Sequence, residues 1–370
     1  MSEVERALAR IDTGAIERNV RHLGSLLGAD TELCAVVKAD GYGHGHAAAA
    51  RAALAGGAAW LAVATAREAQ ALRDAGLADA RVLVMGALTH EDLRIALAAR
   101  ADVVAWTREL VEAIDVPASF AARVHVKLDS GMGRLGTKDP QEARELCALV
   151  DAREGLELAG LMTHFATADE PGDDHFPEQL ERFTPLAREV KGAYPQAIVH
   201  AANSAAVYRD RAAHFDLVRC GVAVYGLDPF GEDPANRGLD PALRLESYVA
   251  AVKRFEPGES VGYGRTWKAS GPTCVGVLPI GYGDGWRRAL SNNADVLVRG
   301  RRRPLVGTVS MDNVTIDLGA ETDVRVGDPA VLIGEQDGEH ILCEEVARRL
   351  DTINYEVTCG LTHRVRREHA

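Results

Sequence analysis

The run LCAVVK at residues 33–38, followed directly by the turn ADGYGHG at 39–45, decides the fold because its pattern returns along the chain. In each return, a short β-branched run precedes a turn residue and a helically spaced stretch rich in Ala, Leu, Glu and Arg. Such strands alternating with helices indicate parallel βαβ units, and eight of them over about 250 residues predict a closed (β/α)8 TIM-type barrel. An open doubly wound α/β sheet is the alternative. The eight runs are 33–38, 60–64, 81–86, 102–106, 123–129, 158–163, 197–201 and 217–222.

The residue composition of the sequence changes after the eighth run. The segment DPFGEDPANRGLDP at 228–241 is crowded with Pro, Gly and Asp and predicts a linker. We therefore predict a barrel domain over residues 1–235 and a mostly β C-terminal domain over 236–370, with one helical stretch, CEEVARRLDT, from residue 343. The strands expected in the second domain are LESYVAAVKRF (245–255), TCVGVLPIGY (273–282), ADVLVRG (294–300), PLVGTVSMDN (304–313), VTIDLG (314–319) and DPAVLIG (328–334).

The charge, the cysteine spacing and the apolar segments of the chain disfavour several classes of function. Lys and Arg number 42 against 54 Asp and Glu, and the net charge of −12 disfavours binding to nucleic acid or to anionic membranes. The basic runs 301–303 and 364–367 are interpreted as solvated strand ends or local anion contacts. The six cysteines form no CxxC pair, so we expect reduced thiols. With no apolar signal core and no bilayer-length apolar segment, the expected location is cytoplasmic.

Functional groups of a barrel lie at the carboxyl ends of its strands. Lys38 ends the first run, and the glycines around Tyr42 allow a ligand to approach the backbone, although an ordinary snorkelling lysine is the alternative. In RVHVKLDSG at 123–131, alternation places His125, Lys127 and Asp129 on one polar face that must line the barrel interior or its mouth. Lys127 there needs an anionic partner or a modification.

A phosphate site is expected in the loops after the seventh and eighth strands, where backbone N–H groups of barrels hold phosphate. These loops contain Asn203-Ser204 and Cys220-Gly221-Val222. The Ser204 hydroxyl can donate a hydrogen bond, and Gly221 lets the backbone come close to a ligand. A simple helix cap at Asn203-Ser204 is compatible with the same donors.

Three features suggest metal or nucleotide binding but do not lead us to predict either. His44 and His46 are explained by the glycine-rich turn that contains them. The trio Asp173-Asp174-His175 lies in a loop after Pro-Gly and is expected to be solvated. The glycines of YGDG at 282–285 open no helical pattern, so they are not interpreted as a nucleotide loop. No metal is expected.

The sequence resembles the bacterial alanine racemases, which are fold-type III pyridoxal 5′-phosphate (PLP) enzymes. VVKADGYGHG is similar to the motif of that family's cofactor-bearing lysine, here Lys38. The resemblance covers nearly the whole chain in order. Its other motifs are VKLDSGMGRLG (126–136), LMTHFATAD (161–169), HAANSAA (200–206), VRCGVAVYG (218–226), VGYGRTW (261–267), LPIGYGDGWRR (278–288), VGTVSMDNVTID (306–317) and INYEVTCGLTHRV (353–365).

The resemblance implies roles for residues of the barrel. Arg219 matches the arginine that faces the cofactor's pyridine nitrogen, and His164 matches the histidine hydrogen-bonded to it. Lys127 matches a lysine that is carbamylated (N6-carboxylysine) and supports the substrate-binding Arg134. Tyr42 and Tyr355 match phenols on the cofactor phosphate, beside the sites at Asn203, Ser204, Gly221 and Val222.

For the second domain, the resemblance implies that Tyr263 is a second catalytic base, opposite to Lys38, and that it reaches the cofactor of the other subunit in a head-to-tail homodimer. Tyr282 and Met311-Asp312 match the entry and substrate-carboxylate region. The implied activity is interconversion of L- and D-alanine, which supplies D-alanine for peptidoglycan. Racemisation of serine or of a broader set of amino acids remains open, as do, further off, a PLP-dependent barrel decarboxylase and a non-catalytic PLP-binding protein.

Overall fold

The computed structural model describes residues 5–116 and 120–370 and divides them into two compact units. The barrel unit is Ile16–Val224, and the β-rich unit joins the described residues up to Ala15 to Tyr225–Ala370. The boundary predicted after residue 235 lies further along the chain than this division, and the prediction did not assign the first residues to the β-rich unit. The two units are described separately.

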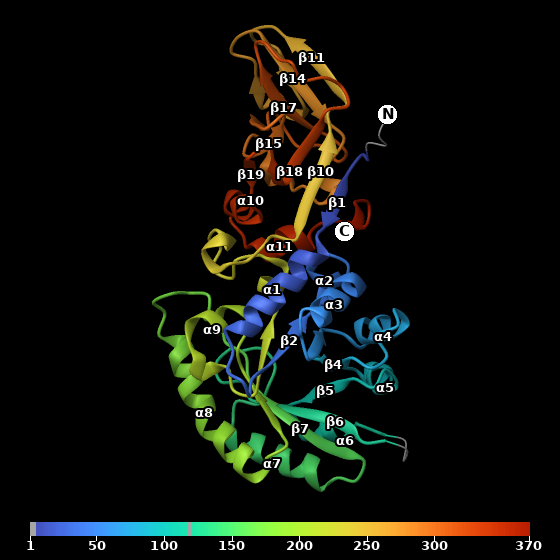
Figure 1. Ribbon diagram of the computed structural model, residues 1–370, viewed down its shortest axis with the longest axis vertical. Helices are drawn as coiled ribbons and strands as arrows, with labels where there is room; N and C mark the ends of the chain where they lie inside the picture. The colour runs from blue at the N-terminus through green and yellow to red at the C-terminus, as the bar shows by residue number, and fades with distance from the viewer. Residues whose placement is uncertain (1–4, 117–119) are drawn as a thin grey trace. The chain divides into compact units, whose positions relative to one another are not determined.

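The barrel unit contains a closed ring of eight parallel strands, with helices outside it (Figure 1). Each of the eight predicted runs overlaps one of these strands, so the TIM-type barrel is confirmed and the open sheet is not. The strands are β2 (Glu32–Val36), β3 (Trp60–Val63), β4 (Arg81–Val84), β5 (Asp102–Ala105), β6 (Ala122–Lys127), β7 (Leu156–Met162), β8 (Ile198–His200) and β9 (Leu217–Cys220).

The barrel interior contains aromatic and polar side chains from strands that are not neighbours in the ring. The His125 ring of β6 meets the His200 ring of β8 edge to face, with centroids 4.9 Å apart, and the Trp60 ring of β3 at 5.9 Å. Since β6 pairs with β5 and β7 and with neither β3 nor β8, these three rings must meet inside the ring of strands. The prediction that the polar face of β6 lines the interior is therefore confirmed for His125.

Local sequence signals determine where the barrel helices begin. Thr65 and Glu68 form a reciprocal capping box at the start of α4, and Thr89 and Asp92 form another at α5, as Thr-x-x-acidic spacing predicts. The helices of this region are α1 (Thr13–Ser25), α2 (Lys38–Tyr42), α3 (His46–Ala55), α4 (Ala66–Asp74), α5 (His90–Ala98), α6 (Arg108–Glu112), α7 (Pro140–Ala152), α8 (His175–Ala193) and α9 (Ser204–Arg209).

The β-rich unit is built on a sheet with the path β16-β15-β18-β10-β1-β20, to which β19 adds beside β18. The N-terminal strand β1 (Leu8–Ile11) lies inside this sheet, antiparallel to β10 and parallel to β20. Strands β11, β14 and β17 form a second sheet, and β12 and β13 form a pair. The bounds are β10 (Leu243–Tyr248), β11 (Ala251–Phe255), β12 (Ser260–Val261), β13 (Trp267–Lys268), β14 (Thr273–Leu278), β15 (Asp295–Val298), β16 (Arg301–Pro304), β17 (Val314–Gly319), β18 (Pro329–Gln336), β19 (Glu339–Ile341) and β20 (Arg366–His369).

Two sequence expectations in this unit were wrong. The run 304–313 was expected to be a strand, but β16 ends at Pro304 and no strand follows before β17. The carbonyls of Ser310 and Met311 instead accept hydrogen bonds from the N–H groups of Tyr282 and Gly283, so this backbone pairs with a turn. Besides the expected helix α10 (Cys343–Leu350), the unit contains α11 (Asn354–Cys359), which is too short to show a helical period.

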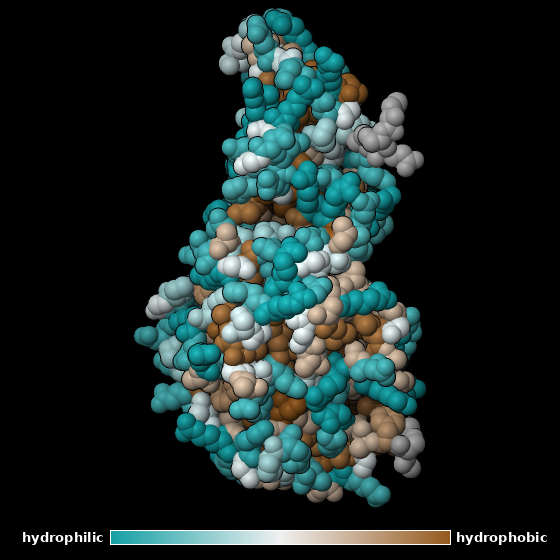
Figure 2. Space-filling view, viewed as in Figure 1, coloured by the Kyte–Doolittle hydropathy of each residue, from teal (hydrophilic) through white to brown (hydrophobic). Residues whose placement is uncertain are grey.

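Ion pairs bind at least one arginine in each basic run of the β-rich unit. Arg302 on the edge strand β16 pairs with Glu345, and Arg366 on β20 pairs with Glu5. Their carboxylate partners support the interpretation of these runs as strand-end charges. Figure 2 shows a largely hydrophilic face on the β-rich unit and patches of apolar residues on the barrel unit. Within residues 5–116 and 120–370, no helix combines the length and hydrophobicity needed to cross a bilayer.

Candidate functional site

Lys38 follows β2 after one intervening residue, Val37, and opens a turn of unusual backbone geometry. Ala39, Asp40 and Tyr42 have φ angles of 51°, 53° and 53°, in the left-handed region that costs non-glycine residues energy. Such a turn persists only where its surroundings hold it. It places the Lys38 Nζ 5.9 Å from the centre of the Tyr42 ring, and the Tyr42 side chain is buried. The lysine and the tyrosine predicted as site residues are thus brought together by one strained segment.

Glu68 holds this turn, and the sequence did not single it out. Its Oε1 accepts a hydrogen bond of 2.7 Å from the N–H of Ala39, while its Oε2 accepts from Ala64 and Thr65 at the end of β3. One carboxylate therefore ties the residue after Lys38 to the neighbouring strand. The capping-box spacing from Thr65 was visible in the sequence, but it carried no sign of the bond to Ala39.

The expected phosphate site brings three barrel loops together. Ser204 Oγ accepts hydrogen bonds from the N–H groups of Gly221 at 2.9 Å and of Ala223 at 3.4 Å, which joins the loop after β8 to the loop after β9. A Cβ placed on Gly221 would lie only 2.3 Å from the Tyr42 hydroxyl oxygen, so a side chain at this position would displace the phenol. A hydroxyl, a phenol and backbone N–H groups in one place are the donors that a phosphate needs.

We call the site formed by Ser204 and the Gly221 loop the Ser204–Gly221 cradle. Asn203 and Val222 lie next to it in the sequence and support its backbone. Asn203 Oδ1 accepts from the N–H of Ala206 at 3.0 Å and caps α9, so the helix-cap interpretation holds for this side chain. Val222 is fully buried behind the loop after β9, where only its backbone can face a ligand.

Arg219 on β9 is a buried cation that is bound by neutral acceptors. Its Nη1 donates to His200 Nδ1 at 2.8 Å, and its Nη2 donates to the carbonyls of Thr163 and Ala201 and to His164 Nδ1 at 3.2 Å. No carboxylate of the described residues pairs with it. Burial lowers the pKa of Arg219 to about 10, which still leaves the guanidinium protonated at neutral pH. Its Nε–H and the second N–H on Nη1 have no acceptor among the described side chains, and an aromatic ring nitrogen can fill that place.

His164 is held as a neutral ring. Burial, followed by the positive charges of Arg219, Lys127 and Arg134, lowers its pKa well below 6.5. Because Arg219 can only donate, His164 Nδ1 is the acceptor and its proton lies on Nε2. The predicted link between His164 and Arg219 is therefore present in the structure.

Lys127 lies in a cationic environment without an ion-pair partner in the described chain. Its side chain is buried, and burial together with the charges of Arg219 and Arg134 lowers its pKa to about 8. The carboxylate of Asp129 is already committed, since it accepts the N–H groups of residues 131–134. An amine with this pKa, under the influence of two arginine charges, is suited to a modification that turns it into an anion.

The remaining predicted residues lie in the β-rich unit. The N–H groups of Tyr282 and Gly283 donate to the carbonyls of Ser310 and Met311 at 3.0 and 2.9 Å, which brings Tyr282, Met311 and Asp312 together. Tyr263 is 73% exposed, and its carbonyl accepts from Thr308 Oγ1 at 2.8 Å. Tyr355 lies on α11 and is half-buried. The predicted site residues thus form two groups, one in each unit.

Asp284 braces the turn that carries Tyr282. It is fully buried, accepts from the N–H of Gly281 at 2.9 Å, and pairs with Arg6 and with Arg364 Nε at 3.2 Å. Arg364 also donates to Asp312 at 2.6 Å. The link from Arg6 in the first residues to this turn spans most of the chain, so the sequence could not suggest it.

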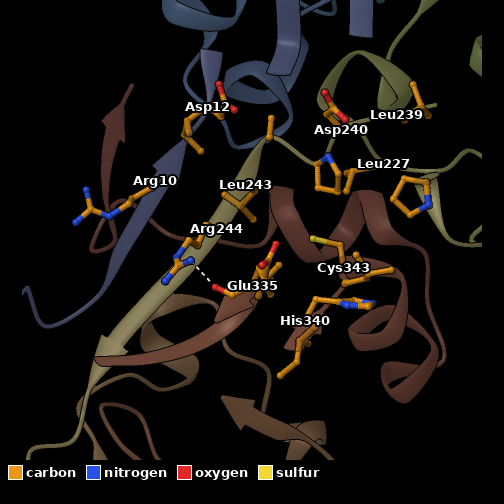
Figure 3. Close-up of a pocket in the computed structure, with 18 of the residues that line it drawn as sticks. Arg10, Asp12, Leu227, Leu239, Asp240, Leu243, Arg244, Glu335, His340 and Cys343 are labelled. Atoms are coloured by element: carbon orange, nitrogen blue, oxygen red, sulfur yellow. Dashed lines mark hydrogen bonds between the residues drawn. The ribbon is translucent and has the colours of Figure 1, made fainter. Parts of the chain in front are cut away.

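A separate cavity of about 530 Å³ lies in the β-rich unit between β10, β18 and α10 (Figure 3). Leu243, Glu335, His340 and Cys343 line it, together with other residues drawn in the figure. None of the predicted site residues belongs to its lining. The cavity and the candidate site are therefore different places.

The histidines and acids set aside as metal ligands have local partners. His44 Nδ1 lies 3.1 and 3.0 Å from the carbonyls of Gly41 and Tyr42, and His46 bonds to Asp40. Asp173 accepts from the N–H of His175 at 2.7 Å at the start of α8. In the described part of the chain, no group of three or more His, Cys, Asp or Glu side chains is arranged to bind a metal.

Comparison with known proteins gives one consistent result. Residues 11–229 match the family model described as "Alanine racemase, N-terminal domain", and residues 242–369 match "Alanine racemase, C-terminal domain". The chain is 42% identical to an alanine racemase of Symbiobacterium thermophilum over 97% of this chain and 96% of that protein. It is also 42% identical to an alanine racemase of Geobacillus stearothermophilus, over 97% of this chain and 92% of that protein.

Solved structures agree with the sequence relatives. An alanine racemase structure from E. faecalis superposes with a TM-score of 0.92 at 37% identity and covers 99% of this chain and 98% of its own. One from Streptomyces coelicolor A3(2) gives a TM-score of 0.93 at 37% identity, with 98% of each chain covered.

Proposed function

Because the chain belongs to the alanine racemase family, we propose that it is an isomerase that interconverts L-alanine and D-alanine with pyridoxal 5′-phosphate as cofactor. The observation that carries the proposal is the cluster at the carboxyl ends of the barrel strands, where Lys38, the Ser204–Gly221 cradle and Arg219 offer an amine, an anion site and a cation. These are the three groups that an aldehyde-bearing, phosphorylated pyridine requires.

The residues present fit the cofactor. Tyr42, Ser204 and the N–H groups around Gly221 would hold its phosphate, Lys38 would hold its aldehyde carbon, and the spare N–H groups of Arg219 would face its ring nitrogen. Tyr355 is proposed as a further phenol at the phosphate. When bound, the cofactor supplies an electron sink for negative charge at the Cα of the substrate.

The proton is moved by two side chains on opposite faces of the substrate, as inversion at Cα demands. Lys38, freed when the substrate's amino group takes its place at the aldehyde carbon, would serve one face and take the α-proton of the D enantiomer. Tyr263 of the partner subunit serves the other face and takes the α-proton of the L enantiomer. Each base returns a proton to Cα when the other has removed one, so the configuration is inverted and no net proton is consumed.

Arg219 directs the reaction toward racemisation. A guanidinium with a pKa of about 10 stays protonated and can only donate, so it keeps the facing ring nitrogen in its unprotonated form. With the cofactor bound, Arg219 would thereby limit the spread of negative charge into the ring and favour return of the proton to Cα.

Arg134 is proposed to bind the substrate carboxylate with support from a carbamylated Lys127. The lowered pKa of Lys127 and the two nearby arginines support this proposal, because a neutral amine reacts with carbon dioxide and the resulting anion then has cationic neighbours. Met311, through its backbone, and Asp312 and Tyr282 are proposed to complete the substrate site from the partner subunit.

A head-to-tail homodimer is proposed as the active form. Tyr263, Tyr282 and Met311 are among the large hydrophobic side chains that the β-rich unit exposes, at 73%, 41% and 51%. Exposed side chains of this kind, gathered on the unit that carries the predicted second base, suit a surface that covers another subunit's substrate site.

The proposal is tested by incubating the PLP-loaded protein with L-alanine and following D-alanine by chiral chromatography. Lys38→Ala is expected to abolish both the bound-cofactor absorbance and the activity, and retention of both would contradict the assignment. A panel of L-amino acids run beside alanine decides between alanine and the broader substrate range, including serine. Release of carbon dioxide would point to the decarboxylase alternative, and binding of PLP without turnover would point to the non-catalytic one.

We also propose a cytoplasmic location and a supply of D-alanine to peptidoglycan precursors. The location is supported by the six cysteines, which form no disulfide in the part of the chain that the structure describes and four of which are buried. The proposed supply to peptidoglycan precursors follows from the product of the proposed reaction, which is D-alanine.

A further inference from the structure

A line of hydrogen bonds leads from Arg219 through the barrel interior to the opposite side. Arg219 Nη1 lies 2.8 Å from His200 Nδ1, His200 Nε2 lies 2.8 Å from His125 Nδ1, and His125 Nε2 lies 3.1 Å from Asp102 Oδ2. The four residues come from β9, β8, β6 and β5. Both histidines are fully buried, and Arg219 and Asp102 are 3% and 5% exposed.

The direction of every proton in this line follows from its two ends. A guanidinium can only donate, so His200 Nδ1 must accept and the proton of a neutral His200 lies on Nε2. That N–H donates to His125 Nδ1, so the proton of His125 lies on Nε2 and points at Asp102. An ionised carboxylate can only accept, so the Asp102 end requires the same direction.

Protonation of either ring would break the line. A second proton on His200 would set two N–H groups against each other at the Arg219 end. Burial, followed by the charge of Arg219, lowers the pKa of His200 well below 6.5 and keeps the ring neutral. Asp102 is itself fixed by Arg123, whose Nε donates to the same Oδ2 at 3.1 Å.

We propose that Asp102, acting through His125 and His200, is a positioning residue for Arg219, because it fixes in both rings the tautomer that presents an acceptor to the guanidinium. The function of Arg219 toward the cofactor ring belongs to the proposed function, on which this inference rests. The line of hydrogen bonds itself is a property of this chain's own side chains. A carboxylate that fixes a histidine tautomer determines what the far ring nitrogen offers to the next group.

Asp102→Asn tests the proposal with little change in shape. The amide can donate to His125 Nε2, which permits the opposite tautomer in both rings and places a His200 N–H against Arg219. Neutron diffraction from deuterium-exchanged crystals of the PLP-loaded enzyme is expected to show deuterium on Nε2 of both rings in the parent. In the variant, where the amide can present either its oxygen or its NH2 group, part of the deuterium is expected on Nδ1, with the Arg219 guanidinium displaced in that fraction.

The functional readout is the ratio of transamination to racemisation, measured as pyruvate formed against D-alanine formed. We expect Asp102→Asn to lower kcat for racemisation by about tenfold or more and to raise that ratio. The KM for alanine should stay nearly unchanged. Asp102→Glu, which keeps an ionised acceptor, should restore most of both values.

Two further variants separate positioning from packing. Asp216→Asn removes a barrel carboxylate that serves Lys191 and the N–H of Val199 without touching a histidine, and it should leave the ratio at the parental level. His125→Phe keeps a ring against Trp60 but breaks the line, so it should behave like Asp102→Asn. It also provides the test if Asp102→Asn fails to fold.

The outcomes are distinct. Parental deuterium on Nδ1 of either ring would overturn the proposal, and so would an unchanged product ratio in Asp102→Asn and His125→Phe. A parent enzyme that binds PLP but forms no D-alanine would contradict the proposed function, while the neutron maps of parent and variant would still decide whether Asp102 fixes the tautomers and the place of Arg219.

Discussion

Arg219 shows how one side chain can be both buried and charged. Removing a cation from water is costly unless its N–H groups are bonded, and here carbonyl oxygens and imidazole nitrogens do this without neutralising the charge. A carboxylate in direct contact would have offset the positive charge that the proposed role needs. Because its acceptors are neutral, the Arg219 guanidinium keeps its positive charge and remains a hydrogen-bond donor beside the proposed cofactor ring.

Arg219→Glu is expected to raise transamination relative to racemisation by at least about tenfold, because a carboxylate can accept a proton shared with the ring nitrogen and so favours its protonated form. Pyruvate formed from alanine by the PLP-loaded variant, measured against D-alanine, checks this. If transamination stayed at the parental level, the role given to Arg219 would be wrong.

Lys127 allows a prediction with a defined pH dependence. Its pKa of about 8 means that the neutral amine predominates above pH 8 and declines about tenfold for each pH unit well below it. After acid treatment has removed the carbamate, carbon dioxide at constant concentration should restore activity faster as the pH rises from 6 to 8, and the rate should level off above pH 8. A recovery rate independent of pH over this range would count against carbamylation at Lys127.

The companion variant Lys127→Ala should reduce kcat/KM by about tenfold or more, since the positive charges of Arg134 and Arg219 would then lack the proposed nearby anion. Added acetate or another small carboxylate should recover part of the loss. The parent enzyme, which needs no such addition, serves as the control.

At the scale of elements, the turn between β2 and α3 depends on a residue of the next βα unit. The carboxylate of Glu68 accepts three backbone N–H groups, and one of them belongs to the residue after Lys38. Strained backbone at Ala39 and Asp40 is thus stabilised from outside its own segment.

Glu68→Gln should weaken this support, because its NH2 group would face an N–H donor. We expect a loss of about 1–3 kcal/mol in unfolding free energy and about tenfold weaker PLP binding. Chemical denaturation and a fluorescence titration with PLP measure the two effects. Asp92→Asn is the matched control, since it disrupts the capping box of α5 with no bond to the turn after Lys38. Equal PLP affinity in the two variants would contradict a special role for Glu68.

The sequence predicted elements with a clear local period and missed those defined by distant partners. The barrel strands were found because buried β-branched runs alternate with helical stretches, and α10 because its apolar residues recur helically. The segment 304–313 is apolar enough for a strand, yet its carbonyls bond to the turn at Tyr282, which no local pattern encodes. The same limit explains why Glu68 and Asp284 were not anticipated.

At the scale of the whole molecule, the proposed site requires two chains. Mixing Lys38→Ala with Tyr263→Phe, each inactive alone, should recover activity after subunits exchange, because one site of the hybrid dimer takes its lysine from one chain and its tyrosine from the other. Random assortment of equal amounts predicts about one quarter of the parental activity.

The activity of the mixture, measured before and after the mixed chains are unfolded and refolded together, checks this prediction. Each variant refolded alone is the control. Absence of recovery, when hybrid dimers are shown to form by tagged pull-down, would rule out a site shared between subunits. Activity in Tyr263→Phe alone would show that this tyrosine is not an essential base.

The position of β1 between β10 and β20 affects how the chain is synthesised. A strand near the start of the chain is paired on one side with residues near 245 and on the other with residues near 367. During translation the first strand leaves the ribosome long before either neighbour exists, while the barrel residues that follow can already fold. The sheet that contains β1 is therefore completed only after residues 366–369 have emerged, so the β-rich unit is completed later than the barrel residues that lie between its two parts in the sequence.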